Sequence, residues 1–160
     1  MNASDVLKYG HFFWLGTLAG LPEESTSSPG VCGVWSAKDV LAHLASYENM
    51  LTDVFNSVLD PSQPTPHLTR MGTLGPEGFN DAEIGERQSL SWEANMAEYT
   101  AGYERNQALV ARFTPELLRQ VGTLPWYGAE YALDDFIVYS FYGHKREHGA
   151  QISAYRDSLK

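Results

Sequence analysis

The sequence predicts an all-α fold, most simply a four-helix bundle in a single domain over residues 1–160. Four long stretches repeat apolar side chains every three or four residues, which is the period of one helix face. No stretch of useful length alternates apolar and polar residues as a half-buried strand does. A chain of 160 residues can also bury a core without disulfides. We therefore expect long amphipathic helices around a shared core.

The first predicted helix covers residues 2 to about 20, and a loop rich in Ser, Pro and Gly follows over residues 22–34. Residues 12–21 form an apolar run preceded by a single basic residue, Lys8. The run is too short to span a bilayer, so we interpret it as the buried part of a helix and not as a signal or anchor segment. The apolar stripe of this helix consists of Leu7, His11, Trp14, Leu15 and Leu18.

The second predicted helix has the clearest start in the sequence. Ser36 can accept a hydrogen bond from a free amide of the first turn, and Asp39, three residues later, can reach back to complete a capping box. The helix ends at Asp60-Pro61, because proline cannot continue it. His43 lies along the edge of its apolar stripe, which consists of Val40, Leu44, Tyr47, Leu51, Val54 and Val58.

A long loop is predicted between the second and third helices. Residues 60 to about 82 contain four of the eight prolines together with three glycines, and they show no helical period. Loops longer than about 15 residues within a compact domain are usually functional or mobile. We therefore expect that this segment can lie over a site as a lid.

The third predicted helix runs from about residue 82 to Phe113, and a short helix restarts at Thr114-Pro115 with a capping Thr and a Pro at the first helical position. Residues 121–130 form a second loop, whose aromatic residues Trp126 and Tyr127 are expected to wall a pocket. The last helix begins near residue 133 and runs close to the end. Its inward stripe consists of Ile137, Phe141, His144, His148, Ile152, Tyr155 and Leu159.

Two histidines of the last predicted helix have the spacing of metal ligands. His144 and His148 are four residues apart, so a helix places them on one face, about 6 Å apart along its axis. His43 can join them if the second and last helices face each other in the bundle. Three imidazoles suit Zn, Ni, Fe or Co and leave a position for water or substrate. The competing interpretation is that each histidine is a packed or hydrogen-bonded core residue.

Other candidate site residues carry a weaker signal. His11 shares an apolar stripe and His67 lies in the Pro-rich segment, but neither repeats a ligand pattern. Glu147 is adjacent to a candidate ligand, although a helix rotates it by about 100° from that residue, and it is a candidate general base. Three residues lie one turn from a candidate ligand and can bond its second ring nitrogen or a bound water, namely Asp39, Tyr47 and Ser140.

The composition excludes several other functions. The net charge is -9, with 11 basic against 20 acidic residues, so the clustered Lys and Arg that phosphate binding needs are missing. The one cysteine, Cys32, cannot form an internal disulfide, and no base stands beside it in the sequence to activate it as a nucleophile. We expect a cytoplasmic protein that binds neither nucleic acid nor membrane.

Two histidine-containing motifs resemble those of a known superfamily. Residues 33–44, GVWSAKDVLAHL, resemble the helix-two motif of the DinB/YfiT-like superfamily, and residues 144–152, HKREHGAQI, resemble its last-helix motif. Residues 78–83, GFNDAE, are similar to the entry into helix three in members related to ClbS/DfsB proteins and to the N-terminal domain of mycothiol-dependent maleylpyruvate isomerases. The resemblance covers essentially the whole chain.

This resemblance implies a four-helix bundle, commonly a homodimer, with a metal triad on His43, His144 and His148. It favours Zn or Ni over Fe, Mn or Co, and it implies a metal-dependent enzyme acting on a small organic molecule. Hydrolysis is slightly favoured over thiol-dependent transfer, because the acidic chain offers few cations beyond Lys145 and Arg146 for the carboxylates of a low-molecular-weight thiol. The alternatives are a non-catalytic protein that binds a small molecule for self-protection, and a dimeric bundle with a structural role.

Overall fold

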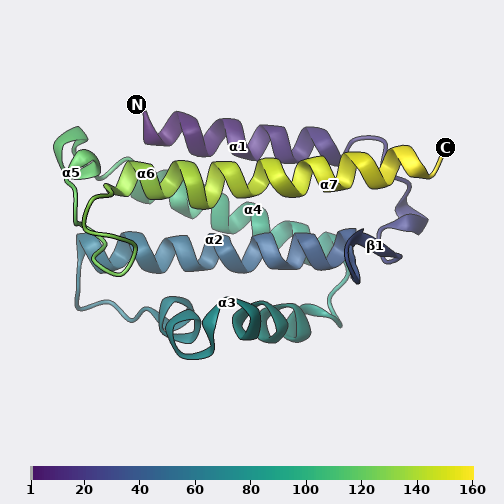
Figure 1. Ribbon diagram of the computed structural model, residues 1–160, viewed down its shortest axis with the longest axis horizontal. Coiled ribbons are helices and arrows are strands. Elements are labelled where there is room, and N and C mark those ends of the chain that lie inside the picture. Colours follow the sequence, from purple (N-terminus) through teal and green to yellow (C-terminus); the bar gives the residue numbers. More distant parts are fainter. Residues whose placement is uncertain (1) are drawn as a thin grey trace.

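Four long helical segments lie side by side in the computed structural model, which describes residues 2–160, and another helix flanks them (Figure 1). The helices are α1 (Ala3–Leu18), α2 (Ala37–Leu59), α3 (Pro66–Arg87), α4 (Trp92–Val110), α5 (Pro115–Arg119), α6 (Leu133–Ile137) and α7 (His144–Ser158). Helix α1 packs against α7, α2 packs against α4, and α3 lies on α2. The predicted all-α bundle is confirmed. None of the helices within the described residues is long and apolar enough to cross a membrane.

The predicted long loop between the second and third helices is wrong, because residues 66–87 form helix α3. The helix has no local cap, since the Thr65 side chain makes no capping hydrogen bond. Instead the Asp53 carboxylate of α2 accepts hydrogen bonds from the backbone amides of His67 (2.6 Å) and Leu68 (3.0 Å). A cap from another helix satisfies the free amides of the first turn without leaving a local sequence signal.

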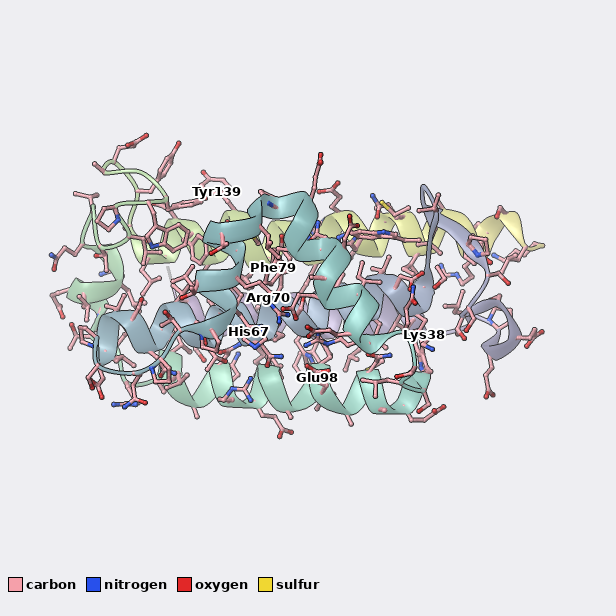
Figure 2. The ribbon with its side chains drawn as sticks, turned by 90° about the horizontal axis from the view of Figure 1, so that it is seen from below. Lys38, His67, Arg70, Phe79, Glu98 and Tyr139 are labelled. Carbon is pink, nitrogen blue, oxygen red and sulfur yellow. The ribbon has the colours of Figure 1, made fainter. Side chains whose placement is uncertain are left out.

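A bend divides α3 into two pieces, and it explains why the segment lacks a single helical period. Gly75 takes a φ of +70°, which residues with a side chain rarely adopt, and Pro76 starts the second piece. Figure 2 looks onto α3, with Tyr139 along one edge and Glu98 along the other. The connection that remains a loop spans residues 60–65.

The predicted third helix is also interrupted, although its apolar period continues through the break. Helix α3 ends at Arg87, and α4 begins after Ser91, whose side chain accepts a hydrogen bond from the amide of Ala94 (3.1 Å). The Arg87 guanidinium crosses the break and donates to both carboxylate oxygens of Glu98, at 2.9 and 2.7 Å. The sequence suggested a single helix here. The structure instead has two helices, joined by the serine cap and the ion pair.

The other helix starts are as predicted. Ser36 and Asp39 form a complete capping box on α2, and Thr114 caps α5. The predicted loop before α2 contains a short 3-10 helix, η1 (Glu23–Ser25), and the antiparallel strands β1 (Pro29–Cys32) and β2 (Trp35–Ser36).

The last helical segment is continuous but not uniform. Between α6 and α7 the chain forms the π-helical segment η2 (Val138–Gly143), a conformation that often occurs at functional sites. His144 begins α7 directly after it. The inward stripe is as expected at Ile137, Phe141, His148 and Ile152, which are buried, but Leu159 is exposed.

The bundle buries an ion pair where α7 meets α2. Lys145 donates to the carboxylate of Glu48, and both side chains are at most 2% exposed. The Asn106 amide of α4 donates to the other carboxylate oxygen and to the Glu48 carbonyl, each at 2.8 Å. A Cβ at Gly102 would lie only 2.7 Å from the Cβ of Glu48, so glycine is what allows α4 to approach α2 this closely. These contacts satisfy charges that would otherwise be costly to bury.

We expect Lys145→Met to lower the free energy of unfolding by about 3–5 kcal/mol, because it leaves the Glu48 carboxylate buried and uncompensated. The double variant Glu48→Gln with Lys145→Met removes both charges and keeps an amide oxygen for Asn106, so most of the lost stability should return. Urea unfolding measures both. A double variant no more stable than the single one would show that side-chain shape, and not charge pairing, matters at this position.

Candidate metal centre

The three predicted ligand histidines come together between α2 and α7. The Nε2 atom of His144 lies 2.8 Å from Nε2 of His43 and 2.9 Å from Nε2 of His148. One ligand atom from each ring falls within 4.8 Å of the other two. The i, i+4 spacing on α7 stacks two of the rings, and the packing of α2 against the last helical segment brings the third from 101 residues away in the sequence.

The spacing of these nitrogens fits a shared ion. Two nitrogens bound at about 2.0–2.1 Å to one ion lie roughly 2.9 Å apart at a right angle and roughly 3.4 Å apart at a tetrahedral angle. The distances from His144 to its two neighbours are close to the shorter value. Three neutral imidazoles are a donor set for first-row transition metals such as Zn, Ni, Fe and Co. The cluster can therefore hold one metal ion.

The surroundings keep these rings uncharged. Burial, with a smaller contribution from the neighbouring His148, lowers the pKa of His43 to about 3. Burial also holds the pKa of His144 well below its usual value, and the two neighbouring imidazoles lower it further. Burial likewise lowers the pKa of His148, although Gln151 and Glu147 oppose the shift. Near neutral pH the rings are therefore neutral, each with one nitrogen that carries no hydrogen, which is the form that binds metals.

The second ring nitrogens have different partners. Nδ1 of His148 lies 2.8 Å from Oε1 of Gln151, one turn further along α7. Because this amide oxygen only accepts hydrogen bonds, the ring proton sits on Nδ1 and leaves the Nε2 lone pair free for the cluster. Nδ1 of His43 is buried and has no hydrogen-bond partner.

Aromatic rings enclose the cluster. The Trp35 ring, carried on β2, lies 5.0 Å from the His43 ring. The Tyr47 ring lies 4.5 Å from that of His43 and 4.6 Å from that of His144, and Phe79 of α3 packs on Tyr47 at 5.8 Å. This surrounding excludes water from the inner side of the three rings, which strengthens electrostatic interactions there.

An open cleft of about 520 Å³ reaches the cluster from the side of the π-helical segment. It is lined by Tyr47, Tyr139, Ser140, Gly143, His144 and Glu147. Two predicted neighbours of the ligands, Tyr47 and Ser140, thus reach the site, and Glu147 shares the cleft with His144. Asp39 does not, because its carboxylate accepts from the backbone amide and hydroxyl of Ser36 in the capping box.

The expectation that Trp126 and Tyr127 wall the pocket is wrong. Their rings pack on Phe136 of α6, with centroid distances of 5.5 and 4.8 Å, and they do not line the cleft beside His144. The loop that carries them closes the end of the bundle near α5 and α6 (Figure 1). Tyr127 packs against the apolar core there, whereas Trp126 is largely exposed.

The remaining predicted candidates lie outside the cluster. His11 stacks on Tyr103, with ring centroids 3.7 Å apart, and its Nδ1 lies 3.2 Å from the hydroxyl of Tyr99. Nδ1 of His67 lies 3.4 Å from the buried carboxylate of Glu83. For these two histidines the interpretation as packed or hydrogen-bonded residues is correct.

Sequence reasoning missed two residues close to the ligands. Gln151 is three residues after His148, so its place on the same helix face was available as a signal. Trp35 precedes the cap of the second helix, and the turn between β1 and β2 that brings it to His43 has no clear sequence signature.

One of three comparisons with known proteins finds a match. A family model described as the DinB superfamily matches residues 14–152, which include all three clustered histidines. No curated protein and no solved structure matches the chain.

The stability of the protein should fall in mild acid partly because of His11. Burial, and then the charge of Lys145, lower the His11 pKa from 6.5 to about 4, so the unfolded chain binds more protons between these pH values. Stability is therefore lost as the pH falls from about 6.5 towards 4, by at most about 1.4 kcal/mol per pH unit for one group. In urea unfolding series from pH 7 to 4.5, His11→Asn should lose stability less steeply than the wild type. If the free energy of unfolding falls with pH equally steeply in both proteins, His11 does not have this role.

Proposed function

The chain belongs to the DinB superfamily, and from this premise we propose that it is a metal-dependent enzyme that acts on a small organic molecule. The proposal assigns His43, His144 and His148 to a divalent transition metal and favours hydrolysis over thiol-dependent transfer. One observation carries it: three uncharged imidazoles present their Nε2 atoms to one point beside an open cleft. A purely structural cluster would have no need of an approach from solvent.

The residues of the cleft have separable roles in this proposal. When bound, a divalent ion supplies Lewis acidity, which lowers the pKa of a coordinated water or thiol. The exposed Glu147 carboxylate lines the cleft with His144, so it can accept a proton from a nucleophile or return it to a leaving group. Tyr47 and Tyr139 provide apolar walls with hydroxyl groups that orient a small substrate.

The charges around the cleft favour hydrolysis. Lys145 is buried and paired with Glu48, and Arg146 lies over the Phe13 ring and donates to the hydroxyl of Tyr142. Among the described residues that line the cleft, the one charged side chain is the carboxylate of Glu147. The carboxylates of a low-molecular-weight thiol would find no cationic side chain there to bind them, whereas a neutral substrate needs none.

We expect the protein purified without chelator to contain close to one equivalent of a transition metal, measured by mass spectrometry together with protein concentration. His144→Ala should lose this metal. His11→Asn is the matched control, because it removes a buried histidine outside the cluster and should keep the metal. If the wild type takes up no metal after incubation with Zn, Ni, Fe, Mn or Co, the proposed metal-dependent function fails, and a loss of stability in His144→Ala would then identify the cluster as structural.

Activity is best sought by screening the metal-loaded protein against small esters, amides and strained-ring electrophiles, with and without added thiol. For a substrate found in this way, Glu147→Gln should lower kcat by about 10²–10⁴-fold without loss of metal, as expected for a general base. Glu116→Gln, an exposed carboxylate on α5, should leave kcat unchanged. A strict requirement for thiol would overturn the preference for hydrolysis, and ligand binding without turnover would instead identify a sequestering protein.

A further inference from the structure

Two buried polar atoms without partners belong to neighbouring helices at the cluster. Nδ1 of His43 on α2 and Oδ1 of Asn80 on α3 are both buried, and neither has a hydrogen-bond partner of good geometry. A donor and an acceptor left unpaired in the interior cost about 1–3 kcal/mol each. Native proteins rarely leave such atoms unpaired, so each of these groups requires an explanation.

The packing of α3 on α2 brings Asn80 close to the histidine cluster. Phe79, the preceding residue, is fully buried and packs on Tyr47, which in turn contacts the rings of His43 and His144. Figure 2 shows Phe79 between α3 and the helices behind it. Asn80 is also close enough to His43 to form a hydrogen bond with its ring. The Oδ1 atom of Asn80 is an acceptor, so it can take the hydrogen of Nδ1.

We propose that Asn80 is a positioning residue for the cluster, whose side-chain oxygen accepts a hydrogen bond from Nδ1–H of His43. This one hydrogen bond satisfies both orphaned atoms at once. The proton is then held on Nδ1, and the Nε2 lone pair points to the nitrogens of His144 and His148. The opposite tautomer would place a hydrogen on Nε2, where a ligand must present its lone pair.

Asn80 and Gln151 then act in the same way on two different rings. Oε1 of Gln151 fixes the tautomer of His148 from within α7, and Oδ1 of Asn80 fixes that of His43 from α3. Such outer partners typically change metal affinity by about 10–100-fold when they are removed. Helix α3 is therefore part of the site as well as a cover for α2.

The first test concerns the tautomer and does not depend on metal. In long-range ¹H–¹⁵N NMR spectra of the metal-free protein near pH 7.5, His43 should carry its proton on Nδ1. In Asn80→Leu, which has similar volume and no acceptor, this preference should be lost. In Asn80→Asp, which keeps an acceptor oxygen, it should remain.

The second test concerns affinity and rests on the proposed function. In competition with a chromogenic chelator, Asn80→Leu should bind Zn²⁺ about 10–100-fold more weakly than the wild type, and Asn80→Asp should restore the affinity. Asn95→Leu is the matched control: Asn95 on α4 is a buried asparagine that also has an unpaired Oδ1, and its loss should leave the affinity unchanged. Thermal unfolding of each variant shows whether it is folded.

The outcomes separate this inference from the proposed function. If the wild type binds no Zn²⁺ but the His43 tautomer still depends on Asn80, the proposed function fails and the positioning role stands. If Asn80→Leu is folded and keeps both the Nδ1–H tautomer and the wild-type affinity, the positioning role is overturned. An affinity that falls equally in Asn80→Leu and Asn95→Leu overturns it as well, because general destabilisation would then explain the loss.

Discussion

The ion pair between Lys145 and Glu48 fixes the position of α7 along α2, and the histidine cluster depends on that register. Lys145 directly follows the ligand candidate His144, and Glu48 lies five residues after His43 on the opposing helix. A buried pair has little freedom to slide, because any shift leaves a desolvated charge without its partner. With the pair in place, His144, directly before Lys145, and His43, five residues before Glu48, present their imidazoles to each other.

Helix α7 thus has two polar faces with opposite requirements. On one face, Lys145 and Glu48 are charged and are completed by Asn106, so that this region is satisfied within the protein. On the other face, burial keeps His144 and His148 neutral. Their Nε2 atoms lie close together, and hydrogen bonds among the clustered rings cannot satisfy every one of these nitrogens. The first arrangement is complete in itself, whereas the second is suited to an added cation.

Helix α3 is held by contacts with the rest of the bundle and lies beside the histidine cluster. Its first turn is capped by Asp53 of α2, and within it the Glu83 carboxylate, which is fully buried, accepts hydrogen bonds from Arg70 (2.6 Å) and Arg87 (2.7 Å). The contact between Arg70 and Glu83 joins the two pieces of the bent helix, and Phe79 packs the second piece on Tyr47 of α2. The segment expected to be a loop that can lie over a site as a lid is instead helix α3, whose Phe79 packs beside the cluster on Tyr47.

The sequence by itself determined the all-α class, the capped start of α2, the short α5 and the pairing of His144 with His148, because caps and helical spacing depend on residues within a few positions of one another. It indicated His43 as the third histidine through the expected bundle and the resemblance of its motif. Only the tertiary structure decided the rest. The cap of α3 comes from Asp53 on another helix. The break before α4 is stabilised by an ion pair between Arg87 and Glu98. The cleft lined by Glu147 is formed where the π-helical segment meets α2. Each of these features rests on contacts between segments far apart in the chain, and such contacts leave no periodic pattern in the sequence.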